Sequence, residues 1–172
     1  MGPIVLMIAA FVFILDAAFL FGKADPKGTG VANAIVGTMM AAMGLHIGFT
    51  AGGNAFLMIL STLSVAFAMF YLILAWCLLA EYDLKALGWY CLGPGLWVLL
   101  AAYFFFAVAG DNIFGVFALS WSLLFLAAWV NLSFGNAAAG AVTRWILAID
   151  SVITLLIPAF LLIIGKWPPF GS

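Results

Sequence analysis

Apolar stretches of about 20 residues, separated by short polar links, run along the chain and place it in a membrane. They cover residues 3–22, 29–49, 55–80, 88–109, 113–134 and 143–165. Each can cross a hydrocarbon core of about 30 Å as an α-helix. Of the 172 residues, 69% are hydrophobic and 6% are charged, too few polar groups to cover a water-soluble protein of this size. We therefore predict an all-α membrane protein with six transmembrane helices.

Several other classes of protein are disfavoured. The first apolar stretch begins at Pro3 without a preceding basic segment or a cleavage site, so we expect a membrane span rather than a cleaved signal peptide. The net charge is −1 and the charges are scattered, which argues against binding of nucleic acid and against a polybasic lipid anchor. Cys77 and Cys91 lack metal-site spacing, and we expect them to be small buried residues.

Cations are distributed unevenly among the links. Lys23 and Lys27 flank the first link, Lys85 the third and Arg144 the fifth, whereas only Lys166 falls on the opposite side. Because Lys and Arg near span ends stay in the cytoplasm, both termini are predicted to lie outside it. This pattern groups the helices as three hairpins, 1–2, 3–4 and 5–6, that turn at charged cytoplasmic links. A threefold internal repeat is one explanation, and the charge rhythm of any even-numbered topology is the other.

A stripe of small residues, spaced by three or four, runs along the second predicted helix. Its members are Ala34, Gly37, Ala41, Gly44 and Gly48. Small residues let two helix backbones approach closely in a membrane. The stripe therefore predicts close helix packing, within the subunit or between subunits.

Two carboxylates, Asp16 and Asp150, lie inside predicted spans. Each would cost several kcal/mol facing lipid, so we expect both to face the bundle interior, a partner or a water-filled cavity. Counted along their helices, both lie about 10 Å from the cytoplasmic face. This common depth suggests a polar station on a path. The alternative is that each carboxylate joins neighbouring helices by hydrogen bonds.

Pro158 adds an acceptor to the same region of the last predicted helix. Its missing N–H is expected to leave the Thr154 carbonyl without a helical donor. Asp150, Thr154 and Pro158 lie on one helical face, where a carboxylate and a free carbonyl could receive an NH2 group. An ordinary kink, satisfied by the Thr154 hydroxyl or by water, is the alternative.

Aromatic residues recur at helical spacing in three predicted helices. They are Phe13 in the first, Phe67 and Tyr71 in the third, and Phe114, Trp121 and Phe125 in the fifth. Rings that point into a bundle can form narrow slots that pass a flat molecule and exclude hydrated ions. Plain core packing gives the same spacing, so the pattern alone leaves both explanations open.

The sequence offers no set of side chains for catalysis. The single His46 lies near a helix end and has no paired Ser. There is no HExxH, GxGxxG or P-loop motif, no ligand set for a metal and no cofactor motif. We therefore predict that the protein is not an enzyme and that its interior is polar and lined by aromatic rings.

The first link and the start of the next helix carry a recognisable motif. Lys23-Ala-Asp-Pro-Lys-Gly-Thr29, followed by Val31-Ala-Asn33 and Val36-Gly37, resembles the signature of the AmiS/UreI family of urea and short-chain amide channels. The resemblance continues through Asp83, Trp89-Tyr90, Trp121-Ser-Leu-Leu-Phe125 and Trp145-Ile-Leu-Ala-Ile-Asp150 to Ile157-Pro158-Ala159. It spans nearly the whole chain.

This resemblance implies that residues 1–172 form a single six-helix transmembrane channel domain in the cytoplasmic (inner) membrane. Its three hairpins would surround a pore in each protomer, and six protomers would form a ring whose centre is filled by lipid. The family pattern also implies a passive path, gated by aromatic constrictions on helices 3 and 5, with an acidic residue on helix 6. Phe67, Tyr71, Trp121 and Phe125 match the constriction residues, and Asp150 matches the acid as a shorter carboxylate.

Other positions depart from the acid-gated branch of the family. Phe13 replaces an aliphatic residue of its constriction, and Asp16 replaces an amide, which leaves the charge and role of Asp16 less defined. The link from Thr50 to Asn54 is short and His46 stands alone nearby, so we predict no acid gating. Ala118 and Phe114 replace Trp, which predicts a roomier slot and favours acetamide-like solutes alongside urea.

Three functional hypotheses follow. The leading one is uncoupled diffusion of urea and short-chain aliphatic amides, whose NH2 donates to Asp150 while the flat body slides between the rings. The second is a proton-coupled transporter in which Asp16 and Asp150 exchange a proton. The third is a non-conducting scaffold subunit. The sequence leaves open the preference between urea and acetamide, and whether a soluble amidase or urease docks on the cytoplasmic links.

Overall fold

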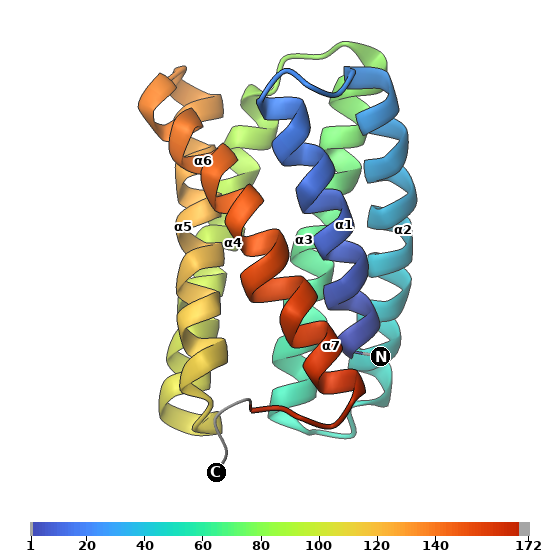
Figure 1. Ribbon diagram of the computed structural model, residues 1–172, viewed down its shortest axis with the longest axis vertical. Helices are drawn as coiled ribbons and strands as arrows, with labels where there is room; N and C mark the ends of the chain where they lie inside the picture. Colours follow the sequence, from blue (N-terminus) through green and yellow to red (C-terminus); the bar gives the residue numbers. More distant parts are fainter. Residues whose placement is uncertain (1, 169–172) are drawn as a thin grey trace.

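The computed structural model describes residues 2–168, and within this range its regular structure is entirely helical (Figure 1). The helices are α1 (Gly2–Leu20), α2 (Pro26–Thr50), α3 (Ala55–Ala80), α4 (Lys85–Phe104), α5 (Asn112–Phe134), α6 (Ala137–Asp150) and α7 (Ile157–Ile163). π-Helical turns extend α4 (η1, Phe105–Ala109) and join α6 to α7 (η2, Ser151–Leu156). The described residues thus form six spans that are long and apolar enough to cross a membrane. This confirms the predicted all-α class with six transmembrane helices.

Polar residues in the links begin several of these helices. Asp25, Asn54, Asp111 and Asn136 each accept a hydrogen bond from a backbone N–H three residues further on, the usual N-cap arrangement. The last of these caps corrects one predicted boundary. The sixth span begins at Ala137 rather than at residue 143, because alanines with high helix propensity follow the cap directly.

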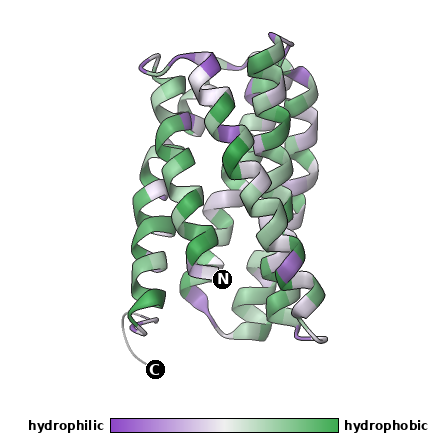
Figure 2. Ribbon diagram, turned by 90° about the vertical axis from the view of Figure 1, so that its right-hand side faces the viewer, coloured by the Kyte–Doolittle hydropathy of each residue, from purple (hydrophilic) through white to green (hydrophobic). Residues whose placement is uncertain are grey.

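The bundle has two distinct ends (Figures 1 and 2). The links after α1, α3 and α5 lie at one end, which we call the charged end because it holds Lys23, Lys27, Glu81 and Lys85. The N-terminus, the links before α3 and α5, and the tail after α7 lie at the other, which we call the terminal end. Between the two ends the helices are mostly apolar (Figure 2).

The helices pair differently from the expectation drawn from the charged links. The most extensive packing is between α2 and α3 and between α4 and α5, whereas α1 packs against α6, η2 and α7. The packed hairpins therefore turn at the terminal end, and the first and last spans form the third pair. Link charges report which side of the membrane a turn occupies, not which helices touch, so they could not reveal this pairing.

Small residues explain the two tightest pairs. A Cβ added at Gly44 would lie 2.9 Å from the Ser64 Cβ of α3. The stripe of small residues on α2 therefore provides close packing within the subunit, which was one of the two predicted alternatives. The Ser61 hydroxyl of α3 donates to the Gly44 carbonyl at 2.8 Å. On the other pair, the Ser122 hydroxyl of α5 donates to the Gly95 carbonyl of α4, also at 2.8 Å.

Two glycines of α4 test this packing. A Cβ at Gly88 would lie 2.8 Å from the backbone nitrogen of Ser133, whereas a Cβ at Gly95 would meet the movable Leu126 Cδ2 at the same 2.8 Å. We expect Gly88→Ala to lower the stability by about 1–3 kcal/mol, because a helix backbone must shift. Gly95→Ala should lower it less. Thermal unfolding in detergent compares the two variants, and equal or reversed losses would contradict this account of the α4–α5 contact.

Candidate functional site

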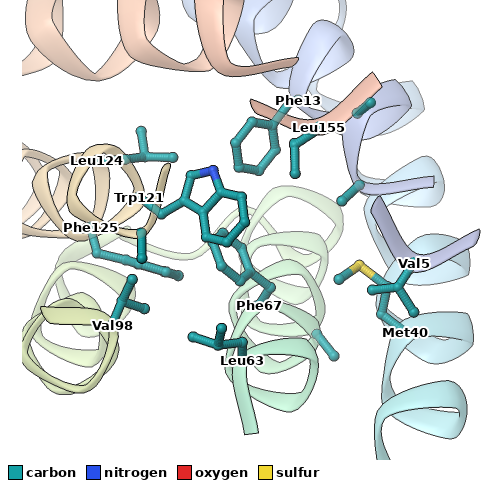
Figure 3. Close-up of a cluster of buried hydrophobic side chains, with 14 of the residues drawn as sticks. Val5, Phe13, Met40, Leu63, Phe67, Val98, Trp121, Leu124, Phe125 and Leu155 are labelled. Carbon is teal, nitrogen blue, oxygen red and sulfur yellow. The ribbon is translucent and has the colours of Figure 1, made fainter. Parts of the chain in front are cut away.

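Five of the predicted aromatic residues form one buried layer across the bundle. We call Phe13, Phe67, Tyr71, Trp121 and Phe125 the aromatic layer. The Phe67 ring is its centre, with centroids 5.9 Å from Phe13, 6.4 Å from Tyr71, 6.0 Å from Trp121 and 4.8 Å from Phe125. Figure 3 shows the rings of Phe13, Phe67 and Trp121 turned toward one another in the space between the helices. The helical spacing of the sequence thus placed these rings on inward faces.

A large cavity of about 260 Å³ lies on the terminal-end side of the aromatic layer. Phe13, Phe67 and Trp121 line its inner limit, and Phe114 lines its wall. Most of the remaining lining is aliphatic, from Val5, Leu6, Ala9, Met40, Ile47, Leu60, Leu63, Leu155 and Leu162. A solute that enters this space therefore loses water without gaining many hydrogen bonds.

A smaller cavity of about 50 Å³ lies on the charged-end side of the layer. Asp16 lines it one helical turn beyond Phe13, and Phe70 and Leu74 line it one and two turns beyond Phe67. In the part of the chain that the structure describes, the two cavities share no lining residue. The residues of the aromatic layer thus lie between the two cavities.

Asp16 pairs with a residue that carried no predicted role. Asn33 of α2 is fully buried, and its side-chain amide donates to Asp16 Oδ1 at 2.7 Å and to the Thr29 carbonyl at 3.0 Å. An Asn inside an apolar span is the sequence signal that could have indicated this contact. The pair joins α1 to α2, as in the alternative that each buried carboxylate joins neighbouring helices. The Asp16 carboxylate also lines the small cavity.

Asp150 has a different environment. Both of its carboxylate oxygens lie within hydrogen-bond distance of the Ser120 hydroxyl of α5, at 3.0 and 2.9 Å. Asp150 is buried, and it lines neither of the two cavities described above. Ser120 also carried no predicted role, because a serine is common enough in a membrane helix to give no signal. The structure thus joins Asp150 to α5 and leaves most of its acceptor capacity unused.

Thr154 holds the largest ring of the aromatic layer in place. The Trp121 indole N–H donates to the Thr154 hydroxyl at 2.8 Å, and this hydroxyl donates to the Asp150 carbonyl at 3.0 Å. The indole therefore has no free donor for a solute. Thr154 acts on the cavity wall through Trp121, and its own side chain lines neither cavity.

The helix before Pro158 does not have the α-helical register that the prediction assumed. Through η2 the helix is wider, and the Ile157 N–H bonds to the Val152 carbonyl five residues earlier. In this five-residue register the missing N–H of Pro158 lies opposite the Ile153 carbonyl, whereas the predicted free Thr154 carbonyl assumed a four-residue register. The free Thr154 carbonyl stays a prediction. The Ile153 side chain is half exposed on the outside of the bundle, away from the aromatic layer.

The tail after α7 closes part of the terminal end. Trp167 lines the large cavity, its ring centroid lies 4.8 Å from that of Phe114, and its indole N–H donates to Asp111 Oδ2 at 3.0 Å. The other Asp111 oxygen caps α5 by accepting from the Phe114 N–H at 2.9 Å. Nothing in the sequence pattern pointed to this tail contact.

The tail contact gives a test of the cavity wall. We expect Trp167→Ala to speed entry of butyramide more than entry of acetamide, because it removes a bulky ring from the mouth of the large cavity. Trp97→Ala is the matched control, since Trp97 also donates to a side chain, Thr62, but lines neither cavity. Stopped-flow solute entry into proteoliposomes measures both rates. An unchanged butyramide-to-acetamide ratio in Trp167→Ala would remove Trp167 from the path.

Comparison with known proteins shows which family the chain belongs to. The family model described as AmiS/UreI family transporter matches residues 1–166. The chain belongs to the AmiS/UreI family. It is therefore a multi-pass protein of the inner membrane that takes part in transport, and the predicted resemblance and localisation are confirmed.

Two relatives of the chain are named as transporter proteins. A transporter protein of Mycolicibacterium smegmatis named for amidate substrates is 28% identical over 167 residues, which cover 97% of this chain and 78% of the relative. The AmiS2 transporter protein of Rhodococcus erythropolis is 25% identical, over 97% of this chain and 81% of the relative. These relatives are transporters rather than enzymes, in keeping with the predicted class.

Solved structures of the Helicobacter pylori urea channel share the fold. Its crystal structure superposes with a TM-score of 0.84 at 25% identity, covering 97% of this chain and 99% of that one. A cryo-EM structure of the same channel in a closed state gives a TM-score of 0.82 at 24% identity, covering 97% and 100%. The helical bundle around the aromatic layer is thus the fold of a known channel.

Proposed function

We propose that this AmiS/UreI protein is a passive channel for urea and short-chain aliphatic amides. The observation that supports this most is the arrangement of two cavities with the aromatic layer between them. The Asp16 carboxylate lies on the charged-end side of this layer. Such a path suits a small, flat, uncharged solute. The names of the relatives, an amidate transporter and a urea channel, support the same class of solute.

The path begins in the large cavity, where an aliphatic amide can place its alkyl group against the apolar wall. Its flat body then passes between Phe13, Phe67 and Trp121 as these rings rotate, since aromatic rings stack on planar groups and leave no room for a hydrated ion. When the layer opens, Asp150 supplies an acceptor for the solute NH2. Contacts must stay weak for the solute to leave again.

The wider arrangement follows the sequence predictions. The whole chain acts as one channel domain, with its charged end in the cytoplasm and both termini outside. Six protomers form a ring around a lipid-filled centre, and each protomer conducts separately. A cytoplasmic amidase or urease that consumes the solute would keep its gradient directed inward.

Solute entry into proteoliposomes, followed by stopped-flow light scattering, tests the proposal. Urea and acetamide should enter faster than into protein-free liposomes, glycerol should gain less, and a pH gradient should not change the final internal concentration. Accumulation above the external concentration would instead support the proton-coupled alternative, which the two buried carboxylates of α1 and α6 favour. Entry rates equal to those of protein-free liposomes would support a non-conducting scaffold.

The proposal includes no acid gate at the terminal end. His46 is exposed near the end of α2, and residues 51–54 form a short link there. We expect His46→Ala to conduct acetamide as fast as wild type at pH 5 and at pH 7.5, because His46 lines neither cavity. A loss of conduction at one pH alone would show that His46 is a gating residue.

A further inference from the structure

Asn33 is oriented by its surroundings so that one of its atoms stays free. Both of its side-chain N–H groups are used, by Asp16 Oδ1 and by the Thr29 carbonyl. Both partners are acceptors, so the amide nitrogen has to face them and the amide oxygen has to face away. The Asn33 oxygen has no hydrogen-bond partner among the described residues, although the residue is fully buried.

Two neighbouring groups are free in the same way. Asp16 Oδ2 and the Tyr71 hydroxyl are buried and lack a partner within residues 2–168. Asp16 is held by Asn33 through its other oxygen, and the Phe13 ring, one turn before Asp16, lies 6.5 Å from the Tyr71 ring. Buried polar atoms are normally paired, so three unpaired atoms at one place indicate a position where a ligand supplies the missing partners.

These groups lie at the charged-end side of the aromatic layer, and Asp16 is the one of the three that lines the small cavity. Tyr71 belongs to the layer, and Asp16 lines the small cavity just beyond it. That cavity of about 50 Å³ is several times the roughly 10–15 Å³ that one water needs. The space therefore suits a molecule of a few heavy atoms.

We propose that Asn33, Asp16 and Tyr71 form a binding site for the CO–NH2 group of the solute on the charged-end side of the aromatic layer. The two N–H groups donate to Asp16 Oδ2 and Asn33 Oδ1, and the Tyr71 hydroxyl donates to the solute carbonyl. This inference rests on the proposed function and adds the group that is recognised. It also makes Asn33 a specificity residue that holds Asp16 with one oxygen free.

Two isomeric solutes test this site. Acetamide and N-methylformamide have the same atoms, but acetamide has two N–H groups and N-methylformamide has one. After subtraction of the protein-free rates, wild type should favour acetamide. Asn33→Leu should lower the acetamide-to-N-methylformamide ratio by about threefold to tenfold, the equivalent of one hydrogen bond to an N–H. Tyr71→Phe should slow both solutes by a similar factor and leave their ratio unchanged, because both carry the carbonyl to which the Tyr71 hydroxyl donates.

The controls separate binding from structure. Tyr71→Phe removes only an oxygen that has no partner, so it should not lower the melting temperature, and it remains informative if Asn33→Leu fails to fold. Tyr103→Phe removes a hydroxyl from a residue on the exposed face of α4 and should leave both entry rates unchanged. Wild-type entry rates of both solutes in Tyr71→Phe would overturn the binding site. Failure of wild type to conduct acetamide at all would instead overturn the proposed function.

Discussion

Trp121→Ala is expected to raise glycerol entry by about tenfold and to reduce the selectivity for urea over glycerol, because the indole is part of the wall between the two cavities. Its ring lines the large cavity and lies 6.0 Å from Phe67, and Thr154 fixes its orientation. Removing a buried indole should also lower the stability by about 3–5 kcal/mol. Stopped-flow entry of urea and glycerol, with the protein content of the liposomes quantified, measures the effect.

Trp129→Ala is the matched control for this prediction. Trp129 lies two turns further along α5, packs against Trp89 and Phe134, and lines neither cavity. It should lose stability without losing selectivity. If both variants kept the wild-type ratio of urea to glycerol entry, the aromatic layer would not be the barrier that solutes cross.

Asp150→Ala should have the second large effect, a fall in urea and acetamide entry of about tenfold, because a buried carboxylate is a strong acceptor for an NH2 group. The same variant leaves the Ser120 hydroxyl without its partner, which should also lower the stability. Entry rates and thermal unfolding are therefore measured together.

Asp150→Asn distinguishes the two roles of this carboxylate. Asparagine keeps an acceptor for Ser120, so the stability should be close to that of wild type, but it removes the charge that attracts the solute N–H. Slow entry through this stable variant would support Asp150 as a residue of the path. Wild-type entry would show that Asp150 only joins α6 to α5, the alternative considered for both buried acids.

Local sequence patterns predicted the features that depend on one helix at a time. The spans follow from length and hydropathy, and the spacing of Phe67 and Tyr71 on α3 and of Trp121 and Phe125 on α5 correctly placed these rings on buried faces. The start of the sixth span was wrong because Gly135 and Gly140 look like parts of a link, whereas the Asn136 cap and three alanines begin the helix there.

Features that depend on contacts between helices escaped prediction. Ser120 meets Asp150, and Asn33 meets Asp16, only because of how α5 packs on α6 and α2 on α1. No spacing within a single helix specifies such a register. The π-helical turn before Pro158 likewise escaped prediction, because a helix read as uniformly α-helical has a different hydrogen-bond register there.

The most direct test of conduction through the subunit is to block the large cavity chemically. In a protein whose Cys77 and Cys91 are replaced by Ala, Ala9→Cys places a thiol on the cavity wall, and Phe11→Cys places one on the exposed outer face of the same helix. Each variant is modified in detergent with a small methanethiosulfonate, checked by mass spectrometry and reconstituted. We predict that modification stops acetamide entry through Ala9→Cys and leaves entry through Phe11→Cys unchanged. Undiminished entry through fully modified Ala9→Cys would contradict a path through the cavity.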